Sequence, residues 1–253
     1  MIRSILWDLD GTLAETERDG HLAAFNQAFE TSGLPWRWSD ARYAELLAVA
    51  GGRERLLHDM QSQGLAPADP KERQALAERV HCLKNRLYSS IAASGALPLR
   101  DGVRELLEDC LRAHVRLGVV TTTSRSNVEA LLAAHLGKDW ETLFDTVVSA
   151  REAPKKKPEP QAYLLALENL RLHPNEAVAM EDAPAGVAAA QAAGVPVIVA
   201  RSHYFAAIEP RGVLAAGPSL GCAAGWDPAP QARATRIGLE QIMRWHRQGT
   251  MVR

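Results

Sequence analysis

Short apolar runs that end in polar residues recur along this chain, and they constrain its fold more than any other feature. The runs span residues 2–7, 115–120, 146–149, 177–180 and 195–200. Short runs that are apolar on both faces are typical of buried parallel strands. From about residue 97 onward they alternate with segments of helical apolar spacing, such as 103–111 and 128–135. The alternation predicts an α/β fold, a mostly parallel doubly wound sheet that includes the first run, with its chemistry at the carboxyl ends of the strands.

Residues 15–95 interrupt this alternation. They contain helical stretches at 22–29, 43–47, 56–60 and 72–87, without a clear buried strand. Polar residues precede this segment, and Gly95 and Pro98 near its end suit a linker. We therefore predict an α/β core domain formed by residues 1–14 and 96–253, and a small inserted helical domain at 15–95. Beyond the last run, residues 217–230 are predicted as a loop and 237–247 as a helix.

The composition excludes several classes of function. The 29 Lys and Arg residues nearly balance the 30 Asp and Glu residues, so no global positive field attracts nucleic acid or an anionic membrane. The N-terminal apolar run is too short for a signal peptide, and no run approaches the length of a membrane span. Cys82, Cys110 and Cys222 form neither a zinc pattern nor a disulfide framework. We expect a cytoplasmic protein with no nucleic-acid or membrane partner, which attracts any anionic substrate locally.

The stretch Asp8-Leu-Asp10-Gly-Thr12 carries the strongest chemical signal. Because side chains two apart on a strand point the same way, Asp8 and Asp10 are aimed at one place. A divalent cation such as Mg²⁺ relieves their repulsion and keeps positions for water and a substrate phosphate. One acid can then attack phosphorus while the other transfers protons. Taken alone, the pair is equally consistent with a solvated turn or a helix cap.

Two further elements suit a phosphate group. Thr121 follows the run at 115–120 and opens a cluster of hydroxyl residues, Thr122 among them, at the predicted start of a helix, where N–H groups and a hydroxyl bind phosphate. Lys157 precedes Pro158, which holds the chain so that the ammonium group can face a phosphoryl anion. The simpler interpretations are an N-cap for the hydroxyl cluster and a solvated loop for the lysines, which we keep for Lys155 and Lys156.

Glu181 and Asp182 complete the pattern, because they follow the run at 177–180 and precede a predicted helix. Asp182 can cap that helix or present its carboxylate to a metal. Each of these groups follows a predicted strand, and an open α/β sheet gathers its active site at that edge. Together they predict a metal-dependent phosphoryl-transfer site.

These residues resemble the four motifs of the haloacid dehalogenase-like hydrolase superfamily, and the resemblance extends over the whole chain. The motifs are the Asp8–Thr12 stretch, Thr121, Lys157 before Pro158, and the Glu181-Asp182 pair. Residues 13–26, 51–55 and 201–205 resemble in particular the CbbY subgroup, which dephosphorylates xylulose 1,5-bisphosphate, an inhibitor of Rubisco in the Calvin cycle. The resemblance implies a Rossmann-like core, with residues 15–95 as a cap that closes over the site and excludes water.

The resemblance also implies a role for each group. Asp8 would be the nucleophile that becomes a phosphoaspartate, and Asp10 the general acid and base. Thr121 and Lys157 would hold the transferring phosphoryl group. Mg²⁺ would be bound by Asp8, the backbone carbonyl of Asp10 and Asp182, with Glu181 in or just outside the ligand shell.

A bisphosphate substrate needs further contacts in the cap. Arg53 and Arg55 are the candidates for its second phosphate, while Glu17 and Thr122 are candidate substrate contacts. Trp36 and Trp38 are expected in the cap core, and the role of His21 stays open. The sequence departs from the family pattern at Ala183, where Ser or Thr is frequent, and at Arg53, where relatives commonly carry Lys.

Several functions compete with a sugar-bisphosphate phosphatase that acts as a monomer. A phosphosugar mutase resembling β-phosphoglucomutase shares all four motifs, and phosphoglycolate is an alternative substrate. A haloacid dehalogenase is disfavoured, because cleavage of a carbon–halogen bond needs neither the metal-binding acids nor Asp10. A non-catalytic module that only binds a phosphometabolite is disfavoured by the intact Asp8 and Asp10.

Overall fold

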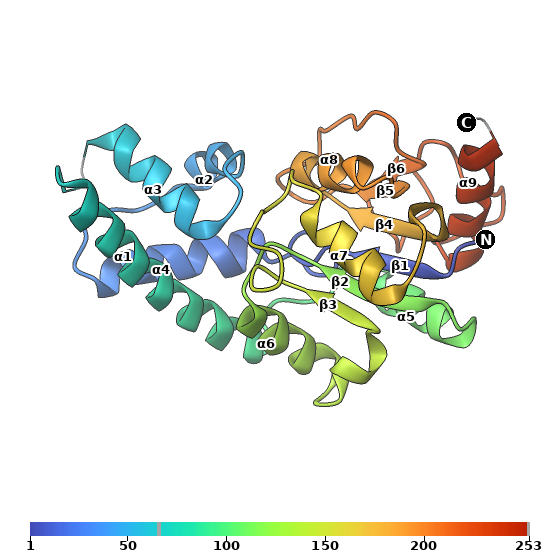
Figure 1. Ribbon diagram of the computed structural model, residues 1–253, viewed down its shortest axis with the longest axis horizontal. Coiled ribbons are helices and arrows are strands. Elements are labelled where there is room, and N and C mark those ends of the chain that lie inside the picture. Colours follow the sequence, from blue (N-terminus) through green and yellow to red (C-terminus); the bar gives the residue numbers. More distant parts are fainter. Residues whose placement is uncertain (65–66, 252–253) are drawn as a thin grey trace.

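The computed structural model describes residues 1–64 and 67–251, and its centre is a six-stranded sheet. Every pair of neighbouring strands is parallel, and the strand order is β3-β2-β1-β4-β5-β6 (Figure 1). The predicted α/β class is therefore confirmed. The strands are β1 (Ser4–Trp7), β2 (Arg116–Val120), β3 (Thr146–Val148), β4 (Ala177–Glu181), β5 (Val197–Ala200) and β6 (Ala215–Gly217).

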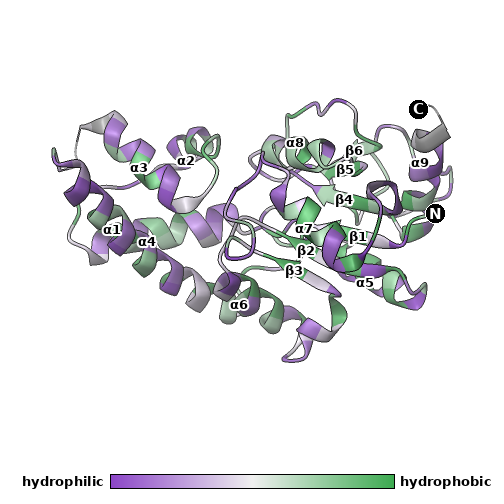
Figure 2. Cartoon of the chain, in the orientation of Figure 1, coloured by the Kyte–Doolittle hydropathy of each residue, from purple (hydrophilic) through white to green (hydrophobic). Residues whose placement is uncertain are grey.

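Helices cover both faces of the sheet. One face packs with α5 (Val103–Arg112), α6 (Arg125–Leu136) and α9 (Leu239–Met251), and the other with α7 (Gln161–Leu170) and α8 (Pro184–Ala192). Ile5 and Trp7 of β1 belong to the first cluster and Leu6 to the second, which is why the strand sequence is continuously apolar. Figure 2 shows hydrophobic residues along the strands and mixed character along the helices. Two short 3₁₀ turns, η2 (Trp140–Leu143) and η3 (Pro174–Glu176), join these elements.

Helices also account for the segment between β1 and α5, where the described residues form no strand. They pack around an aromatic cluster that contains Phe25, Phe29, Trp38 and Tyr43, with Trp36 partly buried beside it. Figure 1 shows these helices to one side of the sheet, with α4 reaching back toward α6. The division into two domains at residues 15 and 95 stays a prediction. The helices are η1 (Glu17–Leu22, a π-helix), α1 (Ala23–Thr31), α2 (Asp40–Leu46), α3 (Gly52–Gln63) and α4 (Pro70–Ala93).

The structure corrects the sequence interpretation of the C-terminal region. Strand β6 was not predicted, because Ala215, Ala216 and Gly217 carry no β-branched or aromatic signal. The predicted loop 217–230 begins on this strand, and its Asp227 forms a β-bridge with Ala216. Gly217 is required there because a Cβ atom would lie 2.1 Å from the Trp226 ring. Among the described residues, no helix combines the length and the apolar character needed to cross a bilayer.

Candidate active site

The turn after β1 brings the first carboxylates to the edge of the sheet. Asp8 is buried, and Asp10 lies beyond it in a turn closed by the Gly11 N–H, which donates to the Ala14 carbonyl. Gly11 has a φ of +85°, and a Cβ atom there would lie 2.2 Å from Asp182 Oδ2. Glycine is therefore required both by the turn and by the close approach of the third acid.

Lys157 connects two of the acids. Its ammonium group donates to Asp8 Oδ1 at 2.6 Å, to Glu181 Oε1 at 2.6 Å and to the Val120 carbonyl at 2.9 Å. Burial disfavours its charge, but the two carboxylates outweigh burial and raise the pKa of Lys157 above its usual range. The lysine is thus a fixed cation at the end of β2.

The acids outnumber this cation. Ligand oxygens of Asp8, Glu181 and Asp182 all lie within 4.8 Å of one another, and all three residues are buried. Burial raises the pKa of Asp8 to about 7, against the opposing charge of Lys157. Burial, together with the charges of Asp8 and Glu181, raises the pKa of Asp182 well above its usual range. The cluster therefore carries uncompensated negative charge whenever all three groups are ionised.

Glu181 is more constrained than its two neighbours. Its Oε1 accepts from Lys157 and, at 2.5 Å, from the Tyr163 hydroxyl. Its carboxylate also occupies the space above Gly186, where a Cβ atom would lie within 2.3 Å of both carboxylate oxygens. Asp182 accepts a 3.2 Å bond from the Thr12 hydroxyl and a hydrogen bond from the Ser202 side chain. Glu181 is thus held by both an ammonium group and a phenol through one carboxylate oxygen.

Asp10 lies at the junction with the helical segment. Its Oδ1 accepts from the Thr16 hydroxyl at 2.6 Å and lies 3.0 Å from His21 Nε2. Lys84 Nζ lies 2.7 Å from Nδ1 of the same imidazole, and an ammonium can only donate, so Nε2 carries the hydrogen that faces Asp10. Burial opposes ionisation of Asp10, but His21 and the hydrogen bonds lower its pKa to about 2. Burial lowers the pKa of Lys84 to about 8.

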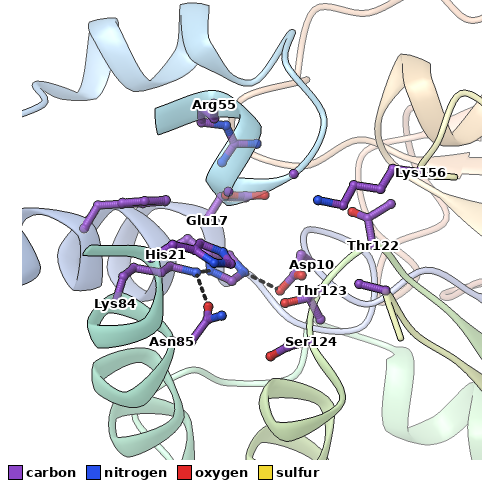
Figure 3. A pocket seen from close by; sticks show the side chains of 15 residues that line it. Asp10, Glu17, His21, Arg55, Lys84, Asn85, Thr122, Thr123, Ser124 and Lys156 are labelled. Atoms are coloured by element: carbon purple, nitrogen blue, oxygen red, sulfur yellow. Dashed lines mark hydrogen bonds and ion pairs between the residues drawn. The ribbon is translucent and has the colours of Figure 1, made fainter. Parts of the chain in front are cut away.

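Two adjoining pockets meet at these residues. The acidic pocket is lined by Asp8, Thr121, Lys157, Glu181 and Asp182, among others. The basic pocket, drawn in Figure 3, is lined by His81, Lys84, Lys156 and the hydroxyl residues 122–124 at the start of α6. Five residues line both pockets, namely Asp10, Glu17, Gly51, Arg55 and Thr122.

Most residues selected from the sequence meet at this double pocket, but Arg53 does not. Its guanidinium lies 3.5 Å from Glu54 and 3.6 Å from Glu78, and it lines neither pocket. The neighbouring Arg55, on the inward face of α3, is buried and takes part in both pockets. Sequence analysis selected both arginines, but only Arg55 lines the pockets, because two helical steps of about 100° each separate their side chains.

Sequence analysis missed several residues of the site. Lys84, Asn85 and Tyr88 lie on α4, far from any motif, where a helical pattern of apolar and charged residues gives no chemical signal. Tyr43 and Tyr163 look like ordinary core residues in the sequence. Lys156 was interpreted as a solvated loop residue, whereas it lines the basic pocket and bonds Glu54 of α3.

The parallel sheet with acids at its carboxyl edge defines a hydrolase of a known family. Residues 2–194 match the family model of the haloacid dehalogenase-like hydrolases. The chain is 38% identical to the plasmid CbbY protein of Cupriavidus necator over 99% of both chains, and 40% identical to CbbY of Rhodobacter capsulatus over 80% of this chain and 87% of the relative. A phosphorylated carbohydrates phosphatase of Thermotoga maritima is 30% identical over 80% of this chain and 86% of the relative.

Solved structures agree with these relatives. CbbY from Rhodobacter sphaeroides in complex with phosphate has a TM-score of 0.78 and 39% identity, over 84% of this chain and 92% of that one. A variant of that protein has been crystallised with xylulose 1,5-bisphosphate, with the same similarity to this chain. The chain belongs to the haloacid dehalogenase-like hydrolases, as a phosphatase of the CbbY type.

Proposed function

We propose that this protein is a Mg²⁺-dependent phosphatase that hydrolyses xylulose 1,5-bisphosphate through a phosphoaspartate on Asp8. One observation carries the proposal: a pocket with a buried acid cluster and Lys157 shares five lining residues with a second, basic pocket. A substrate with phosphates at both ends matches these two compartments. The complex of the Rhodobacter sphaeroides relative with the same bisphosphate supports the choice of sugar.

The donor set of the acidic pocket fits Mg²⁺. Carboxylate oxygens are its preferred ligands, and the excess of buried negative charge over Lys157 calls for a divalent cation. We propose Asp8, Asp182 and the backbone carbonyl of Asp10 as ligands, with Glu181 just outside, held by Lys157 and Tyr163. The cation would neutralise charge on the transferring phosphoryl group.

The chain's own residues account for phosphoryl transfer. An Asp8 carboxylate oxygen attacks phosphorus while the bond from phosphorus to the sugar oxygen breaks. The fixed ammonium of Lys157 and the Thr121 hydroxyl hold the phosphoryl oxygens during this step. Water then attacks phosphorus, which releases inorganic phosphate and regenerates Asp8.

Asp10 handles the protons on both sides of this intermediate. In the free protein its low pKa and its hydrogen bonds from Thr16 and His21 keep it ionised. A bound phosphate dianion raises the pKa of a neighbouring carboxyl group, because like charges disfavour ionisation. Asp10 then gives its proton to the leaving sugar oxygen, and as a carboxylate it takes one from the attacking water.

The second phosphate is assigned to the basic pocket. Arg55 and Lys84 are buried cations at its wall, and buried charge-assisted hydrogen bonds are stronger than exposed ones. Glu17 lies between the two compartments, where a sugar hydroxyl can donate to it. Thr122 also lines both pockets, at the start of α6. We further propose a cytoplasmic monomer, in keeping with the three free cysteines.

The test is phosphate release by the purified protein with Mg²⁺ from four substrates: xylulose 1,5-bisphosphate, ribulose 1,5-bisphosphate, phosphoglycolate and β-glucose 1-phosphate. We expect the highest kcat/KM for xylulose 1,5-bisphosphate, with the Asp8→Asn variant as the blank for contaminating phosphatases. A preference for a monophosphate would refute the bisphosphate assignment and keep the phosphatase. Conversion of β-glucose 1-phosphate to an isomer without release of phosphate would identify a mutase.

A further inference from the structure

The Tyr43 hydroxyl joins the two substrate-facing residues that line both pockets. It donates to Glu17 Oε2 at 2.5 Å and accepts from Arg55 Nη1 at 2.8 Å. Tyr43 is completely buried, and its pKa is raised well above its usual range by burial, so the phenol stays neutral. A neutral hydroxyl is the one group here that can donate to a carboxylate and accept from a guanidinium at once.

Both partners are oriented by this hydroxyl. Arg55 is also fixed through Nε, which donates to the Leu46 carbonyl at 3.1 Å, and its guanidinium lies over the Tyr43 ring. Figure 3 shows Arg55 and Glu17 on the same side of the pocket, across from Thr122 and Lys156. Among the described residues, Arg55 Nη2 and Glu17 Oε1 have no hydrogen-bond partner, so each keeps one position for a ligand.

The position of the hydroxyl keeps the two charged groups apart. A guanidinium and a carboxylate that line one pocket attract each other, and a bidentate ion pair between them would occupy both ligand positions. No such ion pair is present between Arg55 and Glu17 in the described part of the chain. The Tyr43 ring cannot move aside easily, because the rings of Phe25, Trp38 and Tyr204 surround it.

We propose that Tyr43 is a specificity-determining positioning residue, whose hydroxyl holds Arg55 for the second phosphate and Glu17 for a sugar hydroxyl by preventing their direct pairing. The inference rests on the proposed function, because it concerns the substrate groups farthest from Asp8. Tyr43 itself touches no reacting atom. It acts only through its two neighbours.

The Tyr43→Phe variant tests this inference, since it removes one oxygen and keeps the ring. For xylulose 1,5-bisphosphate we expect kcat/KM to fall about tenfold to hundredfold, mainly through KM, as is typical when a buried hydrogen bond to charged groups is lost. For p-nitrophenyl phosphate, which has neither a second phosphate nor sugar hydroxyls, kcat/KM should stay within about twofold. The matched control is Tyr204→Phe, which removes a hydroxyl that bonds Asp40 outside both pockets.

A double variant separates positioning from a general structural effect. In the native background, Glu17→Gln should weaken turnover of the bisphosphate. In the Tyr43→Phe background it should raise kcat/KM, because it removes the carboxylate that would otherwise capture Arg55. Equal losses for both substrates, or additive losses in the double variant, would overturn the inference. Failure of the native protein to prefer the bisphosphate over p-nitrophenyl phosphate would instead count against the proposed function.

Discussion

At the scale of single residues, Asp8 separates an enzyme from a binding protein. Its carboxylate lies beside Lys157 and its two acidic neighbours, where an amide can replace it without a change of shape. We expect Asp8→Asn to abolish phosphate release and to retain binding of xylulose 1,5-bisphosphate, measured by calorimetry with Mg²⁺. Turnover that survives the substitution would contradict the nucleophile assignment. Asp109→Asn serves as the control, because Asp109 lines neither pocket.

Lys84 gives the site a pH dependence of its own. Burial lowers its pKa to about 8, so the free protein loses this cation as the pH rises through that value. Because kcat/KM reports ionisation of the free enzyme, its value for the bisphosphate should fall above pH 8, while the value for p-nitrophenyl phosphate should not follow it there. Lys84→Met should lower kcat/KM for the bisphosphate and remove this alkaline decline. If kcat/KM for both substrates falls over the same alkaline range, the assignment of Lys84 to the second phosphate is refuted.

At the scale of elements, the sequence predicted the parts that depend on local pattern. Strands β1, β2 and β4 are apolar on both faces, and the polar residues that follow them belong to motifs. The fold and the acidic pocket could therefore both be predicted from the sequence. Lys84 and Tyr43 were not, because their roles arise from the way α4 and α2 pack against η1. Arg53 was chosen beside Arg55 because residue spacing does not define the rotation of α3. Lys84 and Tyr43 reach the site through tertiary contacts, which leave no pattern in the local sequence.

An ion pair between elements connects the helical segment to the core, at the residue next to Lys157. Lys156, in the loop before α7, donates to Glu54 Oε2 of α3 at 2.5 Å. We expect Glu54→Gln to raise KM for the bisphosphate severalfold with little change in kcat, because α3 also carries Arg55 and would be held less firmly. The melting temperature should change little, since partly exposed pairs contribute roughly 1 kcal/mol or less. Glu129→Gln, which removes an Arg125 partner on α6, is the control, and an unchanged or lower KM would contradict this role.

At the scale of the whole molecule, the candidate site lies where the edge of the sheet meets the helical segment. The sheet supplies the acids and Lys157, and the helical segment supplies Arg55, Glu17 and Lys84. The formal net charge of the chain is only −1, so the attraction of a phosphorylated substrate depends on these local cations rather than on a global field. The negative charge of the buried acids also affects stability, because Asp8, Glu181 and Asp182 lie close together at the sheet edge.

The stability of the metal-free protein should decrease as pH rises from about 4 to 7. Asp8 and Asp182 have raised pKa values in the folded state, so over this range the folded state binds more protons than the unfolded state. By linkage, their contribution to the stability of the folded state is fully present below the unfolded pKa and is lost as pH rises through the folded pKa.

At pH 8, Mg²⁺ bound only to the folded state should raise the melting temperature by roughly 5 °C. Asp182→Asn should raise the metal-free melting temperature at pH 8 and remove the Mg²⁺ effect. Thermal denaturation at pH 5.5 and 8, with Mg²⁺ or with EDTA at equal ionic strength, measures both effects. A metal-free protein equally stable at both values, or a native protein indifferent to Mg²⁺, would show that the three acids do not form a cation site.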